Sequence, residues 1–428
     1  MQDYWNKVKG IQKLQRGMYI ILPLRYDAEV KLDDIAVSGY KPIEFASEDF
    51  IELLNSKCST SGDFVRRFRI APDELKISPA GLEDSGITIA DLQLFAFTGG
   101  IAFLAVYLSY CNGNVSSVYD FILPGYTNEG EKIKETQMRF LKELEEKLIN
   151  RIAPKMDWFI SEESYKPFLL KEAYRMNVAG LPKRFEETET ANRITYNEHR
   201  IIDLSADFTD ASEKDVAYVT GAKDVNLCNY GWGCAITSQE ISYAYAIGDK
   251  SPVERAQDDL LLTMLVMYQK YACMHLNEEI HQRYVSQGKN THRKKSIRDL
   301  KHEAMTFIAY GTLAPSQISR WNNVCETYRA LIELNGINET IEEIKEKISL
   351  LDEEQERIDS QRENTIGMII AVFGLISIAA SVLQIVDYVS TGSLGMLVSF
   401  GISAGCSLLF GIWLIIMLLR RKKHKGDV

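Results

Sequence analysis

Two long segments without a charged side chain lie close to the C-terminus of this 428-residue chain. The first runs from Thr365 to Val386 and the second from Gly392 to Leu419. About 20 consecutive apolar residues make a helix long enough to cross the hydrocarbon core of a bilayer. A helix at the surface of a soluble domain keeps a polar side. The two runs therefore predict two transmembrane helices, 365–388 and 394–419.

The charges around these runs predict their orientation. The second run ends in the cationic cluster Arg420 to Lys425, which the positive-inside rule places in the cytoplasm. With two spans the N-terminal part is then cytoplasmic as well, and only an outer loop, 389–393, reaches the far side. The first residues contain no apolar core, so no signal peptide is predicted. We expect a multi-pass protein of the inner (plasma) membrane with both termini in the cytoplasm.

The rest of the chain has the composition of an ordinary soluble protein. The whole sequence is 46% hydrophobic and 25% charged, with a net charge of −10. We expect an α+β cytoplasmic domain, then a long stalk helix and the two C-terminal transmembrane helices. The predicted boundaries are 1–250 for the α/β domain, 251–315 for a helical hairpin, 316–364 for stalk helices and 420–428 for a basic tail.

Several segments before residue 250 carry strand or helix patterns. The most apolar of them, Leu92 to Tyr110, holds Gly99 and Gly100 at its centre, which favours a buried β-hairpin over a third span. Further strands are predicted at 18–26, 65–71, 215–224 and 230–237, and an amphipathic helix at 138–152. Helices are predicted at 253–284 and 296–311, with another from about 316 that Asn335 and Gly336 break or bend. The seven cysteines contain no Cys-x-x-Cys pair and are expected to be free thiols.

Apolar residues at alternating spacings of four and three begin at Ile337. The positions are 337, 341, 344, 348, 351 and 358, with Gln355 at the remaining step. This heptad seam requires a packed partner helix. No proline or glycine follows before Gly367, so we expect one rod from Asn338 to Tyr388, roughly 75 Å long at 1.5 Å per residue. The alternative is two helices with a break at the membrane surface.

Small and polar residues of the first span recur at helical spacing. Two explanations stay open: close packing between helices, or a water-filled pore. The long amide of Gln384 favours the pore, with Asp387 at its mouth. The predicted pore-lining residues are Asn364, Gly367, Ala371, Gly374, Ser377, Ser381, Gln384 and Tyr388.

The second span carries another periodic set of small residues, which favours close packing against the first span. Its members are Ser399, Gly401, Ser403, Gly405, Ser407 and Gly411. No catalytic constellation is found, and the histidines lack metal-ligand spacing, so we expect no enzyme and leave the metal ligands unassigned. His275 is expected to be a helix-packing residue. No direct binding of nucleic acid is expected.

The order of these elements resembles the CorA-type divalent cation transporter superfamily. The stretches that carry the resemblance are "LFAFTGGIAFLAVYLSY", "DDLLLTMLVMYQKYACMHL" and the long run from Ile337 to Val389. Members are homo-oligomers, typically pentamers, whose first spans line a central pore. The resemblance thus implies a metal ion transmembrane transporter or channel that assembles with itself in a lipid bilayer.

One departure limits what the resemblance implies. The family's Gly-Met-Asn signature at the outer end of the first span is replaced here by "VDYVSTGS", and Gly395-Met396 lacks the asparagine. Magnesium selectivity is therefore not carried over. Divergent relatives occur beside antiviral type III CRISPR systems, which suggests a channel opened by a small nucleotide messenger. The alternatives are a housekeeping transporter of Mg, Co or Ni ions and a non-conducting membrane-anchored scaffold. The only ligands implied are divalent cations or a nucleotide.

Overall fold

The computed structural model describes residues 2–8, 10–43, 64–77, 86–123, 130–160, 169–207, 231–246, 251–285, 297–308, 312–319, 321–391 and 405. The chain divides into two compact units, Met1–Ile348 and Ser349–Val428. The first unit mixes helices and strands, as predicted. Helix α14 (Ile337–Thr391) begins in the first unit and continues without a break into the second.

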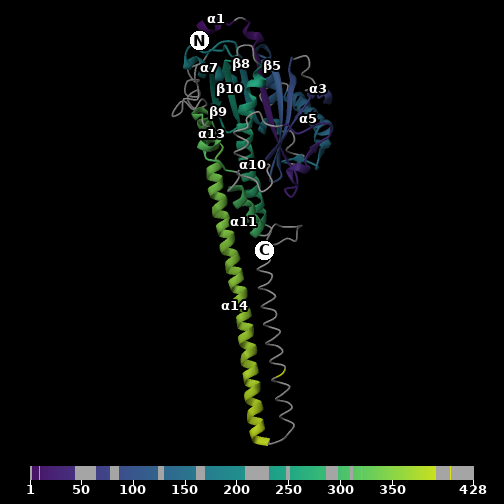
Figure 1. Ribbon diagram of the computed structural model, residues 1–428, viewed down its shortest axis with the longest axis vertical. Coiled ribbons are helices and arrows are strands. Elements are labelled where there is room, and N and C mark those ends of the chain that lie inside the picture. Colours follow the sequence, from purple (N-terminus) through teal and green to yellow (C-terminus); the bar gives the residue numbers. More distant parts are fainter. Residues whose placement is uncertain are drawn as a thin grey trace. The chain divides into compact units, whose positions relative to one another are not determined.

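The first unit is built on a sheet of eight strands (Figure 1). Seven follow the order β3-β4-β5-β1-β8-β10-β9, and β7 pairs with β1 beside β8. Strands β8 and β10 run parallel, whereas the other pairs are antiparallel. The strands are β1 (Gln15–Arg25), β3 (Val65–Ile70), β4 (Thr88–Phe97), β5 (Ile101–Cys111), β7 (Asp157–Trp158), β8 (Tyr174–Leu181), β9 (Trp232–Ile236) and β10 (Glu240–Ala246), with a separate pair of β2 (Ala36–Val37) and β6 (Ile152–Ala153).

The predicted hairpin at 92–110 is confirmed as β4 and β5. The connection passes through Gly99 and Gly100, with φ of +88° and +84°, a region that glycine enters without steric cost. A Cβ on Gly100 would lie 2.6 Å from the Tyr26 carbonyl oxygen, so this turn also needs the missing side chain. Both strands lie inside the sheet and are buried almost throughout, which is why this segment is so apolar.

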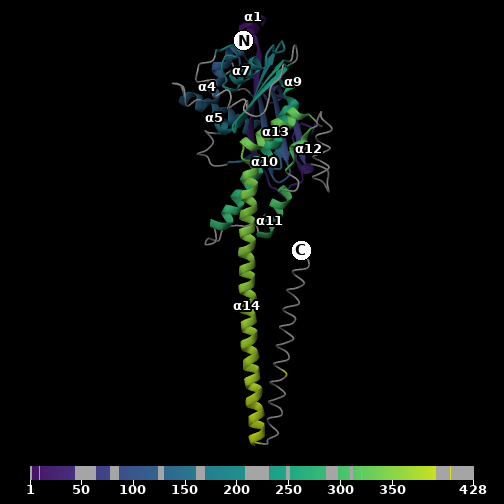
Figure 2. The same ribbon diagram turned by 90° about the vertical axis from the view of Figure 1, so that its left-hand side faces the viewer.

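One face of the sheet is covered by α4 (Val115–Ile122), α5 (Gly130–Lys147) and α7 (Thr188–His199) (Figure 2). Apolar residues of α4 and α5 join alternate residues of β1, β4 and β5 in one large hydrophobic cluster. A second, smaller cluster joins α7 to β8 and β10. The helix predicted at 138–152 is therefore α5. It begins earlier than predicted and ends at Lys147, where a 3-10 turn, Ile149–Arg151, follows.

The opposite face is covered by α9 (Pro252–Arg255) and α10 (Gln257–Val285). Aromatic rings form this contact: Tyr268 stacks on Phe97 with centroids 4.7 Å apart, and Tyr271 meets Phe103 edge-on at 5.5 Å. The predicted continuous helix from 253 to 284 is wrong in one respect, because the chain turns at Ala256 between α9 and α10.

The predicted hairpin partner of α10 is α11 (Ile297–Thr306), which contacts it. His275 is half-buried in that contact, with Nε2 3.9 Å from Glu303 Oε1, in line with a packing role. The predicted third helix is split into α12 (Pro315–Ile318) and α13 (Asn322–Leu334). The remaining helices are α1 (Gln2–Asn6), α3 (Pro72–Leu75) and α6 (Leu169–Glu172).

Most of the other predicted elements can be located. The strands at 18–26, 65–71 and 230–237 are confirmed as β1, β3 and β9. The strand predicted at 215–224 lies outside the described residues. The described cysteines 111, 234, 273 and 325 are free thiols, as expected.

Candidate functional site: the apolar part of helix α14

Helix α14 contains a segment long and apolar enough to cross a membrane. The segment runs from Asp359 to Leu383 with a mean hydropathy of 2.6, and none of its most apolar window is buried. Met368, Leu375 and Leu383 are 69%, 67% and 69% exposed. Water does not tolerate so many apolar side chains side by side, so this surface requires lipid or protein around it.

The second predicted span runs from 394 to 419. Its residues lie outside the described part of the chain except Gly405, which is helical and exposed. The predicted packing residues Ser399, Gly401, Ser403, Ser407 and Gly411 therefore lie outside it as well. In the part of the chain that is described, one helix satisfies the length and composition of a membrane span.

The predicted pore-lining residues occupy one side of α14. Because successive helical residues are rotated by about 100°, spacings of three and four keep Asn364, Gly367, Ala371 and Gly374 on this side. Nothing lies within 4 Å of the place where a Cβ would stand on Gly367 or Gly374. The backbone at 384, 387 and 388 belongs to α14, whereas the side chains of Gln384, Asp387 and Tyr388 lie outside the described residues.

One serine on this side, Ser381, forms a hydrogen bond within the helix itself. Ser381 Oγ donates to the Ser377 carbonyl oxygen at 2.8 Å, and both side chains are half-exposed. A hydroxyl bonded to the carbonyl four residues earlier is satisfied without water. Ser381 is thus compatible with either a pore or a dry helix contact.

Two isoleucines share the side with the small residues. Ile378 follows Gly374 by four residues and precedes Ser381 by three, and Ile385 follows Ser381 by four. Their side chains are 63% and 54% exposed. The face is therefore small and polar with two hydrophobic interruptions, which differs from the uniform polar face that the spacing suggested.

The start of α14 is anchored in the first unit. The seam residues Ile337, Ile341 and Ile344 are buried at 2%, 7% and 1% exposure. Lys347 Nζ lies 3.0 Å from the Asn277 side-chain oxygen of α10. The partner that the heptad seam requires is therefore supplied, over its first turns, by the same chain.

Buried polar side chains hold α7 to the sheet. Arg16 of β1 and Glu198 of α7 are both fully buried, with Arg16 Nε 2.7 Å from Glu198 Oε2. Arg16 Nη1 also donates to the Asn112 side-chain oxygen at 2.9 Å. Burial raises the pKa of Glu198 to about 7, although Arg16 opposes the shift.

A second carboxylate, that of the partly buried Glu240, lies beside this pair. Glu240 of β10 accepts from Arg175 Nε at 3.0 Å and from Asn177 Nδ2 at 3.2 Å, and His199 Nε2 is 3.4 Å from its other oxygen. Burial alone would raise the pKa of Glu240, but Arg175, His199 and the hydrogen bonds lower it overall. Both carboxylates are thus paired with arginines.

A further network lies on the opposite face, at the first residue of α10. Gln257 Nε2 donates to Tyr19 Oη at 2.7 Å, and Tyr19 Oη donates to Asp91 Oδ2 at 2.8 Å. Arg69 Nε pairs with Asp91 Oδ1 at 2.7 Å. The sequence analysis predicted neither of these polar networks. Charged residues that alternate with apolar residues along a strand give the same sequence pattern whether they face water or a covering helix.

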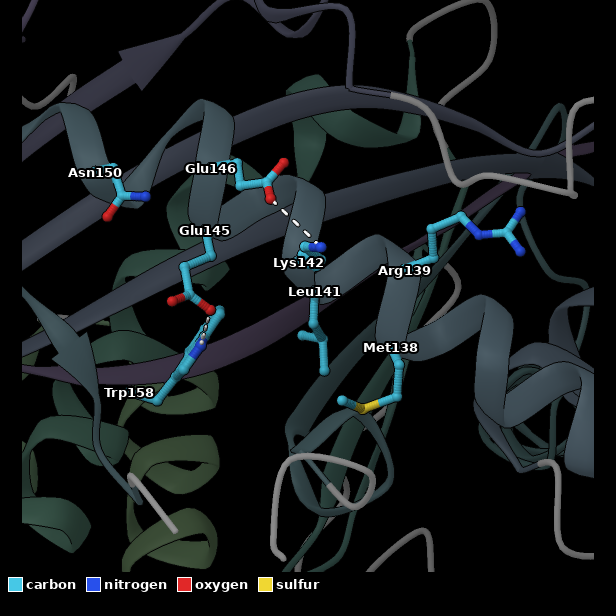
Figure 3. A pocket seen from close by; sticks show the side chains of 8 residues that line it. All are labelled: Met138, Arg139, Leu141, Lys142, Glu145, Glu146, Asn150 and Trp158. Carbon is cyan, nitrogen blue, oxygen red and sulfur yellow. Dashed lines mark hydrogen bonds and ion pairs between the residues drawn. The ribbon is translucent and has the colours of Figure 1, made fainter. Parts of the chain in front are cut away.

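The surface of α5 carries an open hollow of about 620 Å³ beside Trp158 (Figure 3). Glu145 Oε2 accepts from Trp158 Nε1 at 3.4 Å, and Lys142 pairs with Glu146 at 3.7 Å. Met138 and Leu141 form the apolar part of the lining. Charges of both signs line an open surface here, so the hollow indicates no particular ligand.

Among the described residues, no group of three or more His, Cys, Asp or Glu side chains could hold a metal ion. Comparisons with protein-family models, curated proteins and solved structures find no match to this chain. The resemblance to CorA-type transporters therefore remains a hypothesis drawn from the order of elements and from α14.

Proposed function

We propose that this chain is one subunit of a CorA-like, homo-oligomeric membrane channel that its N-terminal domain gates. The observation that carries the proposal is α14, which starts among buried residues of a folded domain and ends as an exposed apolar segment. A continuous helix of this kind connects a domain that can bind an effector to a segment that can sit in lipid.

The proposed pore would require an oligomer. One or two spans cannot enclose an ion pathway, so several copies must contribute one face each. The face with Gly374 and Ser381 suits this role, because small side chains leave room and hydroxyls tolerate water. The large apolar residues on the other side, such as Leu383, would then face lipid or neighbouring helices.

The ion and the effector are separate parts of the proposal. Asp387 near the outer end of α14 would offer one carboxylate per subunit, which favours cations in general. For the effector we favour a small nucleotide messenger, as in antiviral defence. In that arrangement the domain is cytoplasmic and the oligomer lies in the inner (plasma) membrane.

Ion flux into liposomes tests the proposal. The full chain is reconstituted, and uptake of K⁺, Cl⁻, Mg²⁺, Co²⁺ and Ni²⁺ is followed with and without candidate cyclic oligonucleotides. We expect flux from the native chain and a loss of at least about tenfold in Ser381→Leu, because a bulky side chain would narrow the pathway.

The matched control is Ala379→Leu. Residue 379 is two positions from Ser381, about 200° around the helix, so the same leucine would be added on the side away from the pathway. Flux that stays native in Ala379→Leu and falls in Ser381→Leu supports the pore. Flux of divalent ions alone, independent of nucleotide, favours the housekeeping transporter, and no flux in any form favours the scaffold.

A further inference from the structure

Two residues, Asn335 and Gly336, separate α13 from α14. Helix α13 ends at Leu334, and Gly336 has φ of +61°, a left-handed conformation that glycine adopts at helix ends. A Cβ placed on Gly336 would have Glu339 Oε2 as its nearest neighbour, 4.0 Å away. The Gly336 N–H donates to the Glu333 carbonyl oxygen at 3.0 Å and its own carbonyl oxygen accepts from the Thr340 N–H at 3.0 Å, so this glycine belongs to the end of α13 and to the start of α14.

One lysine of α10 reaches this junction. Lys270 Nζ donates to the Asn335 side-chain oxygen at 2.9 Å and to the Ser238 carbonyl oxygen at 3.2 Å. It also lies 6.0 Å from the centre of the Tyr174 ring, a cation–π contact. One ammonium group therefore bonds Ser238 in the β9–β10 turn and Asn335, the residue before Gly336, and lies over the ring of Tyr174, the first residue of β8.

The contacts of Lys270 in the described part of the chain are to neutral groups. Burial lowers its pKa, and the described contacts include no carboxylate that would oppose the shift. A partly buried cation without a counter-charge is held less firmly than a buried ion pair such as Arg16–Glu198. By contrast Lys347, further along α14, bonds both Asn277 and Glu343.

We propose that Lys270 is a positioning residue that couples the β9–β10 turn to the junction of α13 and α14 at Asn335 and Gly336. If an effector shifted the β9–β10 turn, the Lys270 ammonium group bonded to that turn would move with it. Its hydrogen bond to Asn335 would then shift Asn335, Gly336 and the first turn of α14. This inference rests on the proposed function only for its consequence in the membrane segment. The coupling itself lies within the first unit.

Amide hydrogen exchange on the full chain in detergent tests the coupling. In Lys270→Met we expect amides of residues 335–341 to exchange about tenfold faster, the effect of losing one or two hydrogen bonds on a local opening. Exchange in β1 and β5 should stay native. Lys270→Arg keeps a cationic donor and should restore protection at 335–341.

The matched control is Lys345→Met on α14. Lys345 pairs with Glu342 at 2.6 Å on the exposed side of the same helix, so its loss should leave 335–341 unchanged. Native exchange at 335–341 in Lys270→Met would overturn the inference. Faster exchange spread evenly over the sheet, without rescue by arginine, would also overturn it, because that pattern indicates general destabilisation.

Flux measurements on the same variants separate this inference from the proposed function. If the native chain conducts, Lys270→Met should change the fraction of time that the channel is open, while Lys345→Met should not. If the native chain never conducts, the proposed function fails, whereas faster exchange at 335–341 would still establish the coupling. Native exchange together with native gating in Lys270→Met rejects the coupling and leaves the channel intact.

Discussion

The Arg16–Glu198 pair lies between two apolar clusters on one sheet face, where neither side chain reaches water. Several groups from different elements face Glu198. They are Arg16 of β1, Tyr110 of β5 and Glu240 of β10, and His199 is its neighbour on α7. Removing one partner from such a pair leaves the other charge buried alone, which makes the pair sensitive to protonation.

The raised pKa of Glu198 predicts a pH dependence of stability. Its pKa rises from the ordinary 4.5 to about 7 in the folded state, so between these values the folded state binds more protons than the unfolded one. Stability contributed by this group therefore falls as pH rises through that window. The glutamine of Glu198→Gln does not titrate, so its stability lacks this pH dependence. We therefore expect the melting temperature of Glu198→Gln minus that of the native chain to increase from pH 5 to pH 8, by an amount equivalent to up to about 3 kcal/mol of unfolding free energy.

Thermal unfolding of both proteins across this range checks the prediction. Glu240, whose pKa is lowered, adds stability above the ordinary carboxyl pKa and loses it as pH falls through the folded-state pKa. That loss lies at lower pH and affects both proteins alike. A difference between the two melting curves that is flat from pH 5 to pH 8 would contradict the raised pKa of Glu198.

Gly17 of β1 leaves room for the Tyr107 side chain, which packs directly over it. A Cβ at this position would stand 2.0 Å from Tyr107 Oη and 2.1 Å from its Cζ, and the Tyr107 ring is fully buried against Tyr19. We expect Gly17→Ala to destabilise the first unit by about 1–3 kcal/mol, as overpacking does. Chemical denaturation measures the loss, and Ser109→Ala, at the paired position of β5, should cost less.

At the level of elements, local signals predicted the hairpin and α14. The paired glycines at 99 and 100 marked the turn between β4 and β5, and the lack of glycine or proline after Ile337 predicted an unbroken helix. Strand β8 and helix α7 gave no such signal. Strand β8 is buried on both faces with Arg175 and Asn177 inside it, and α7 buries Asn197, Glu198 and His199. Burial of paired polar groups is a tertiary property that periodicity does not report.

The same limit applies to the candidate site. The spacing of the small residues predicted that they lie on one side of α14. The hydrogen bond between Lys270 and Asn335 joins positions 65 apart in sequence, and no local sequence pattern predicts it. Nothing in the sequence around Lys270 distinguishes it from an exposed helix lysine. The choice between a pore and a packing face depends on copies of the chain that one sequence does not describe.

The two isoleucines on the small face lead to a prediction for α14. If this face lines a pathway, Ile378 would form a hydrophobic ring that closes the pore by excluding water. We therefore expect Ile378→Ser to raise flux in the absence of effector by at least about tenfold. The control is Ile376→Ser, about 200° around the helix and 59% exposed, which places the same change on the opposite side. Equal flux from the two variants would argue against a gate at Ile378.

For the whole molecule, the number of spans decides where the folded domain lies. The positive cluster after Leu419 would be cytoplasmic by the positive-inside rule, and two spans would then keep the first unit on the same side. A single span would place the two ends of the chain on opposite sides. This matters for function, because a cytoplasmic domain meets intracellular messengers whereas an external one does not.

Labelling of introduced cysteines in intact spheroplasts of a bacterial host distinguishes these topologies. A membrane-impermeant maleimide should label Ser393→Cys in the outer loop before lysis, and should label Ser360→Cys and Lys425→Cys only after lysis. The native chain gives the background from its own cysteines, of which those at 234 and 273 are buried in the folded unit. Labelling of Lys425→Cys but not of Ser360→Cys before lysis would mean one span, and the basic tail would then lie outside. Labelling of Ser393→Cys alone fixes two spans and requires any effector of the folded domain to act from the cytoplasm.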